Sequence, residues 1–274
     1  MWPNNALIDL FKAEIQKAWS FPILEIAVGL IAFTTIANIH VLLNISTQTG
    51  LLASFSILIS DSFFDSLYSQ MLFLSIFCGV LVSLSFARDY EQGFMQTLLS
   101  SPVSRSVVFL VKFFAVILPL TILTWVMTTS IVFLNFYSGS SVMVVIEKAL
   151  WALPVIFIAL MFCGGFAAFI SLSLKRTIPS VLTVVLAGFS IWYISTVTSD
   201  VVGNIANYFI LTPFPVPLIA LSRVFGRVVT PFISLGDFEY VLPTWVFWVL
   251  SVFYALVFLV PVYVYFTRRF EIRE

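Results

Sequence analysis

Residues 106–134 read SVVFLVKFFAVILPLTILTWVMTTSIVFL, and this stretch decides the class of fold. Its one charged side chain is Lys112. A helix needs about 20 mostly apolar residues to cross the roughly 30 Å of hydrocarbon in a bilayer. Barrel strands would instead alternate apolar and polar residues in segments of about ten. The stretch therefore predicts a membrane-spanning helix.

The composition of the whole chain also indicates that most of the protein lies in lipid. Of its 274 residues, 61% are hydrophobic and 9% are charged, and 30 are Phe. A soluble domain carries about 45–50% apolar and about 25% charged residues. One globular core could not hide this much apolar surface, and the formal net charge is zero. These values exclude a water-soluble enzyme, a disordered protein and a nucleic-acid-binding domain.

Working outward, we expect an all-α integral membrane protein with one permease domain over residues 1–274. A helix over 4–19, with charged residues between its apolar ones, is predicted to lie in the membrane surface. No cleavable signal peptide is expected. Six crossings are predicted at about 21–44, 68–87, 106–134, 148–173, 178–199 and 243–267.

The distribution of Lys and Arg predicts the orientation, because cytoplasmic loops are enriched in these residues. With the N-terminus inside, the outer side holds only Lys148, Arg223 and Arg227. The inner side then holds Lys12, Lys17, Arg88, Arg105, Lys112, Lys175, Arg176, Arg268, Arg269 and Arg273. Both termini are therefore predicted to be cytoplasmic.

Two predicted outer connections, 45–67 and 200–242, are too apolar for plain loops. In the second, Arg223 and Arg227 lie one helical turn apart. We interpret 200–242 as a re-entrant region whose short helix dips into the outer leaflet, with the arginines at the headgroups. A surface helix that only seals the bundle is an equal alternative.

Residues for enzyme chemistry are scarce. Cys78 and Cys163 stand singly in different crossings, as ordinary buried thiols do, and no metal site is expected. No Gly is followed by Lys, so a Walker-type phosphate loop is excluded. His40 lies near a crossing's outer end, and Glu25 is the one carboxylate inside a predicted crossing. This pattern predicts no catalytic residues.

Small residues in the fourth crossing predict close helix packing. Gly164 and Ala168 have the small-xxx-small spacing that lets membrane helices approach one another. We favour packing within the chain over a subunit interface.

The segment 88–105 reads RDYEQGFMQTLLSSPVSR. Met95, Leu98 and Leu99 fall along one face of a short helix that would present them to water. Pro102 ends that helix because the residue before a proline avoids the helical region. Ser104 is predicted to cap the next helix. A tight inner loop also needs a turn and some charge, so an ordinary loop stays an alternative.

These residues resemble the inner segment of the type-2 ABC exporter permeases (ABC-2 type, type V fold). In that family the inner segment typically contains, in this order, Glu, Gly-Thr-Leu-Glu, Leu-Leu, Pro-Val-Ser-Arg and a Gly-Lys pair. The chain departs from it at 94–96 and at Val111. It matches in type and spacing at Glu91, Gly93, Leu98, Leu99, Pro102, Val103, Ser104, Arg105 and Lys112.

The resemblance implies a transport subunit rather than an enzyme, in the plasma membrane of a bacterium or archaeon. It implies a second permease (identical or a close paralogue), membrane lipids, and a separate ABC ATPase that holds ATP and Mg. The resemblance also implies that residues 89–104 form a coupling segment that contacts the ATPase. The residues that would make this contact, together with Arg105 just beyond the segment, are Glu91, Gly93, Met95, Gln96, Leu98, Leu99, Pro102, Val103 and Ser104.

Alternating access driven by that ATPase would export a substrate. The many Phe residues and the expected absence of buried charge favour an apolar or amphipathic cargo: a lipid, peptide or drug. An ion- or proton-coupled secondary transporter is the alternative, and it would depend on Glu25. A lipid-modifying membrane enzyme would need clustered polar residues near one leaflet, which the sequence does not offer.

Overall fold

The computed structural model describes residues 4–20, 23–33, 36, 40, 74, 76–100, 103–133, 142–201, 232–235, 238–241 and 243–268. Six long or medium helices run through these residues. They are α1 (Asn4–Ala18), a helix over 76–91, α5 (Arg105–Phe133), α6 (Val142–Leu174), α7 (Thr177–Val201) and α10 (Thr244–Arg268). Two shorter helices are Ile23–Phe33 and α4 (Phe94–Ser100).

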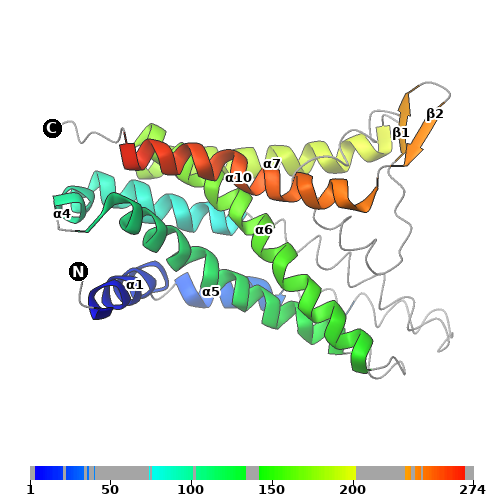
Figure 1. The fold of residues 1–274 in the computed structure, drawn as a ribbon, viewed down its shortest axis with the longest axis horizontal. Helices are drawn as coiled ribbons and strands as arrows, with labels where there is room; N and C mark the ends of the chain where they lie inside the picture. The colour runs from blue at the N-terminus through cyan, green and yellow to red at the C-terminus, as the bar shows by residue number, and fades with distance from the viewer. Residues whose placement is uncertain are drawn as a thin grey trace.

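The long helices form a bundle with two distinct ends (Figure 1). At one end lie α1, α4 and the last turn of α10; at the other end lie β1 (Phe232–Leu235) and β2 (Phe238–Val241). Helix α6 packs against α5, α7 and α10, while α1 packs against α5. Consecutive long helices therefore run back and forth between the two ends.

Membrane spans are supported by length and composition. Within the described residues, Arg105–Val126, Ala149–Leu174 and Trp245–Arg268 are long and apolar enough to cross a bilayer. The pair Leu7–Ala18 and Ile23–Phe33, bent by 67°, passes the same test together. The chain is thus a helical multi-pass membrane protein. The count of six crossings and the interfacial position of α1 stay predictions.

The described residues are almost entirely helical, as expected, and they add one short β-hairpin. Strands β1 and β2 pair antiparallel, with Phe232 opposite Val241 and Leu235 opposite Phe238. The hairpin lies inside 200–242, the region that was expected to contain a short helix. Arg223 and Arg227, expected on that helix, fall outside the described residues. The stretch 45–67 also falls outside them. Two residues, Gly236 and Asp237, separate the strands, and Gly is frequent in such short hairpin loops.

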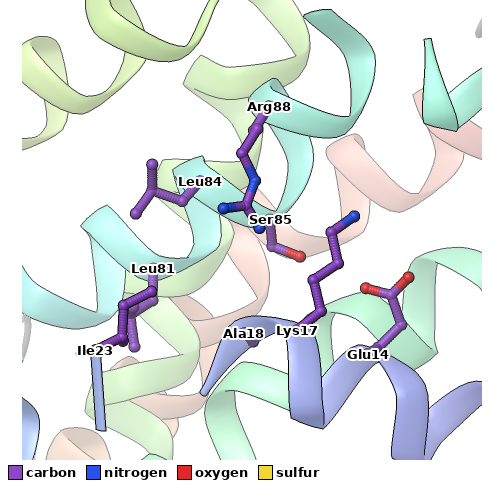
Figure 2. A pocket seen from close by; sticks show the side chains of 8 residues that line it. All are labelled: Glu14, Lys17, Ala18, Ile23, Leu81, Leu84, Ser85 and Arg88. Atoms are coloured by element: carbon purple, nitrogen blue, oxygen red, sulfur yellow. The ribbon is translucent and has the colours of Figure 1, made fainter. Parts of the chain in front are cut away.

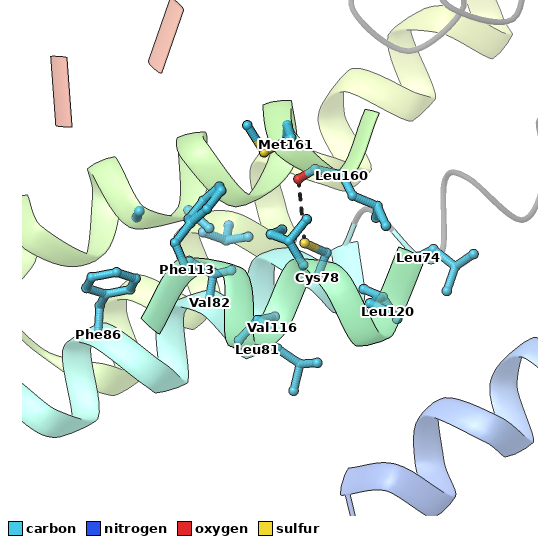
Figure 3. Close-up of a cluster of buried hydrophobic side chains, with 14 of the residues drawn as sticks. Leu74, Cys78, Leu81, Val82, Phe86, Phe113, Val116, Leu120, Leu160 and Met161 are labelled. Carbon is cyan, nitrogen blue, oxygen red and sulfur yellow. Dashed lines mark hydrogen bonds between the residues drawn. The ribbon is translucent and has the colours of Figure 1, made fainter. Parts of the chain in front are cut away.

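The core lies where the 76–91 helix, α5 and α6 meet (Figure 3). Leu81, Val82 and Phe86 contribute buried apolar side chains from the first of these, and Leu74, just before it in the chain, is buried as well. The Cys78 thiol donates a hydrogen bond to the Leu160 carbonyl over 3.7 Å. Both cysteines are buried and free, as predicted.

Glycines allow the helices to approach closely. A Cβ at Gly164 would come within 2.7 Å of Ile117 Cδ1 on α5, and one at Gly165 within 3.1 Å of the Leu259 backbone nitrogen on α10. Ala168 is fully buried. The prediction that Gly164 and Ala168 serve packing within the chain is therefore confirmed.

Candidate functional site

The segment 89–104 makes a sharp reversal where the 76–91 helix ends. The Gln92 amide donates to the Arg88 carbonyl, and the Gly93 amide donates to the Tyr90 carbonyl over 3.1 Å. Gly93 has a φ of +76°, a left-handed conformation that costs little only for glycine. Helix α4 starts at the next residue. The glycine therefore lets the short helix turn away from the helix that precedes it.

The prediction that Ser104 caps the helix that follows it is confirmed. Helix α5 begins at Arg105, and the Val107 amide donates to Ser104 Oγ over 3.4 Å. The hydroxyl thus satisfies one of the amides that a helix leaves unpaired at its N-terminus. Pro102 falls outside the described residues, and α4 ends before it, at Ser100.

The side chains that α4 buries and exposes differ from the expectation. Met95 is 1% exposed, and Leu98, Leu99 and Val103 are half-buried against the same core. The prediction that Met95 faces water is wrong: on a seven-residue helix the apolar side chains pack onto the helices behind it. The outward residues are Phe94, which is 54% exposed, and Gln96 and Thr97.

A buried ion network lies behind α4. Lys112 Nζ donates to Glu14 Oε1 over 2.9 Å and to Asp89 Oδ2. Lys17 Nζ donates to Asp89 Oδ1. The side chains of Lys112 and Asp89 are 1% and 0% exposed. Three separate helices, α1, 76–91 and α5, are therefore joined by two cations and two carboxylates.

Burial makes this network costly to disturb. Removing charges from water is expensive, and the loss is recovered only when each ion keeps close partners of the opposite sign. Lys112 contacts both carboxylates, and Asp89 contacts both ammonium groups. The charges balance within the cluster. We infer that it fixes α1 against the end of the bundle.

Beside the network, one contact reaches α4 and a separate pair of hydrogen bonds reaches the start of α7. Lys17 Nζ lies 5.1 Å from the centre of the Phe94 ring, at the first residue of α4. Glu91 accepts hydrogen bonds from the Thr177 amide (3.1 Å) and hydroxyl (2.6 Å). Thr177 is the first residue of α7, so the carboxylate lies at the positive end of that helix.

A second contact holds the connection between α6 and α7. Lys175 has a φ of +55° and places its Nζ 5.0 Å from the centre of the Tyr90 ring. Both Tyr90 and Glu91 thus hold the α6–α7 turn against the last turn of the 76–91 helix. A displacement of α4 would reach α1 and α5 through direct contacts, and α7 through the preceding turn that carries Tyr90 and Glu91.

The other candidates lie away from this network. Glu25 is exposed on the Ile23–Phe33 helix, and His40 is exposed. Arg105 is exposed at the first residue of α5. No group of three or more His, Cys, Asp or Glu side chains arranged to hold a metal occurs in the part of the chain that the structure describes.

Sequence reasoning missed the ion network. Glu14 and Lys112 are 98 positions apart, and no local pattern joins them. The available signal was Lys112 itself, a cation placed inside an otherwise apolar stretch. An ion in such a position usually has a partner.

The contact between Glu91 and Thr177 predicts a pH dependence. The two Thr177 hydrogen bonds hold the pKa of Glu91 below its ordinary value of 4.5. Because the pKa is lowered in the folded state, the contact stabilises the protein above pH 4.5 and its contribution is lost as the pH falls through the folded-state value. We expect Glu91→Gln to lower the melting temperature slightly at pH 7, and this difference to shrink as the pH falls below 4.5.

Thermal unfolding in detergent over pH 3–8 measures this effect. Asp9→Asn, an exposed carboxylate on α1 with no hydrogen bond among the described residues, is the matched control. A difference between Glu91→Gln and the parent protein that grows toward low pH would contradict the prediction.

No protein-family model matches the sequence, and no curated protein matches it.

Proposed function

We propose that this chain is the membrane subunit of an ATP-driven exporter of the ABC-2 type. Helix α4 and its flanks are the segment that meets a separate ATPase. The carrying observation is a short helix at one end of a membrane bundle that contacts α1 and α5, next to a flanking residue, Glu91, that contacts α7. The motif Glu91 to Arg105 and its resemblance to the family support the same assignment.

The mechanism follows from these contacts. ATP binding would draw two ATPase subunits together, and each would move the α4 of its permease. Through Lys17, Asp89 and Lys112 the movement reaches α1 and α5; through Glu91 it reaches α7. Closely packed helices transmit such shifts as rigid bodies. The bundle would thereby alternate between inward and outward access for an apolar or amphipathic cargo.

The alternative is an ion- or proton-coupled secondary transporter. The buried cluster of Glu14, Asp89 and Lys112 is the one observation in its favour, since proton relays use intramembrane carboxylates. However, the cluster lies near the α4 end of the bundle, because Lys112 is in the second turn of α5. It is also closed by matched ion pairs. A structural clamp explains these features better than a proton path.

The test is purification from the native membrane, followed by ATP hydrolysis in lipid with a panel of candidate cargoes. We expect a dimer of permeases with a nucleotide-binding subunit, and hydrolysis that a cargo stimulates. Single cysteines at Ser104 and Gly236 should label from opposite sides; Cys78 and Cys163 are buried and give little background. An active complex without a nucleotide-binding chain, driven by an ion gradient, would overturn the proposal.

A further inference from the structure

Helix α5 contains a proline, Pro119, inside the apolar stretch Arg105–Val126. In an α-helix each amide donates to the carbonyl four residues earlier, and proline has no amide hydrogen. Pro119 therefore leaves the Ala115 carbonyl without its usual donor from α5. Ala115 is 1% exposed. A buried carbonyl without a partner is costly, and lipid supplies no donor to replace the missing one.

The missing donor comes from a different helix. Trp19 follows the last residue of α1, and its Nε1 donates a hydrogen bond to the Ala115 carbonyl over 3.0 Å. The bond is buried and joins residues 96 positions apart. Its length is that of an ordinary N–H···O hydrogen bond. The indole of Trp19 thus takes the place of the amide that Pro119 removes from α5.

The other prolines inside described helices differ in this respect. Pro154 in α6 and Pro261 in α10 leave the carbonyls of Leu150 and Val257 without the same helix donor. In the part of the chain that the structure describes, no side chain donates a hydrogen bond to either carbonyl. Among these three prolines, the one in α5 is therefore the one whose free carbonyl is bound by another helix.

Two features of α5 near Pro119 favour bending. Proline is the commonest site of sharp kinks in helices. Two residues further on, Thr121 Oγ1 donates to the Ile117 carbonyl over 2.8 Å, and such back-bonding by threonine often bends a helix. Both features lie within residues 115–121, the part of α5 that Trp19 contacts. The bond from Trp19 therefore acts where α5 is weakest.

The end of α1 is attached to α5 at two successive levels. Lys112 pairs with Glu14, and the carbonyl of Ala115, three residues further along α5, binds Trp19. On another side, α1 meets the 76–91 helix across a gap that holds about one water. Figure 2 shows this gap, with Ser85 on its far wall. Packing on that side is incomplete and loses dispersion contacts, so the attachment of α1 depends more on α5.

We propose that Trp19 is a latch on a bend point in α5. With the indole bound, the Ala115 carbonyl is satisfied and α5 stays in the form that the structure shows. When the end of α1 moves away, the carbonyl loses its donor and α5 becomes free to bend at Pro119. The latch needs only this chain. Its use in transport, where a movement of α4 would reach α1, rests on the proposed function.

A double-mutant cycle on the purified permease, without any ATPase, tests the latch. Trp19→Phe keeps an aromatic ring but removes the donor. It should raise the equilibrium constant for unfolding about tenfold, which corresponds to 1.4 kcal/mol, because a buried acceptor loses its partner. Pro119→Ala restores an amide four residues after Ala115, so Trp19→Phe should cost clearly less in that background. Denaturant titration in micelles measures each constant.

Trp125→Phe is the matched control. Trp125 Nε1 donates over 2.7 Å to the Ala149 carbonyl of α6, and Leu153, four residues after Ala149, keeps its amide. Because α6 itself can supply a donor to this carbonyl, Trp125→Phe should cost less than Trp19→Phe. Its cost should also be the same with and without Pro119→Ala.

Spin labels at Leu110→Cys and Val126→Cys measure the bending itself. Both positions are exposed, on either side of Pro119, and they are about 24 Å apart along α5 at 1.5 Å per residue. Trp19→Phe should widen the distribution of distances between the labels, and adding Pro119→Ala should narrow it again.

A folding defect in Trp19→Phe would leave the test decisive. If that variant does not fold, the latch predicts that adding Pro119→Ala recovers folded protein, and failure to recover it would overturn the proposal. Equal costs of Trp19→Phe with and without Pro119→Ala, or an unchanged distribution of label distances, would also overturn it. These outcomes concern the permease alone, so they are distinct from a failure to bind an ATPase.

Discussion

Replacing Lys112 with Met is expected to destabilise the protein by about 3–5 kcal/mol, since breaking a buried ion pair leaves an uncompensated charge. Lys112 is 1% exposed and is the partner of Glu14 and of Asp89. After the change Asp89 keeps Lys17, but Glu14 loses the one ion pair it makes among the described residues. Unfolding of the purified protein, titrated with denaturant in micelles, measures the loss.

A double variant separates charge from packing. In Glu14→Gln with Lys112→Met, the remaining Asp89 and Lys17 form a balanced pair. Apolar replacement of a buried ion pair is often close to neutral. The double variant should therefore be at least about 1 kcal/mol more stable than Lys112→Met alone, the size of coupling usual for residues in contact.

Lys12→Met is the matched control for that series. Lys12 lies on α1 like Glu14 and Lys17, but it is exposed and makes no ion pair in the described part of the chain. Such surface changes usually stay within about 0.5 kcal/mol. Equal effects of Lys12→Met and Lys112→Met would mean that the network does not hold α1 to the bundle.

The outcome at Ser104 and at Met95 shows what local sequence can predict. A helix cap depends on one side chain and on amides two or three residues away, so Ser104 was predicted correctly. The direction of Met95 depends on which neighbours lie behind α4. Those neighbours come from other helices, and a helix of seven residues has too few positions for its apolar face to be recognised.

Long-range contacts account for the rest of what sequence reasoning missed. Apolar length alone places α5, α6, α7 and α10 close to the expected stretches, because hydropathy is a property of each segment. The ion network and the contact between Glu91 and Thr177 join residues 23 to 98 positions apart. The β1–β2 hairpin did have a local signal: Gly-Asp between residues rich in Phe, Ile, Tyr and Val.

The position of Met95 and Leu98 changes how the coupling assignment must be tested. Both pack against the permease's own core, so Leu98→Asp would disturb the fold and its effect on transport would be ambiguous. Phe94 is the large apolar residue on the outer face of α4, 54% exposed at the end of the bundle that carries α1. If a groove on the ATPase receives α4, Phe94 is the anchor.

Replacing Phe94 with Ala should therefore weaken binding of the ATPase subunit by about 30- to 1,000-fold, the 2–4 kcal/mol typical of a buried interface anchor. Within the permease the same change removes only the contact with Lys17, worth about 0.5–1 kcal/mol at an exposed site. Titrating the purified permease in lipid nanodiscs with the ATPase measures the affinity, and the melting temperature of the permease checks its fold.

Phe33→Ala controls for the loss of an exposed Phe. Phe33 is 73% exposed on the Ile23–Phe33 helix, about 15 Å along that helix from its start at 1.5 Å per residue. It should leave the affinity for the ATPase unchanged. If Phe94→Ala also leaves the affinity unchanged while the permease stays folded, α4 does not dock on the ATPase, and its contacts with α1 and α5 serve stability alone.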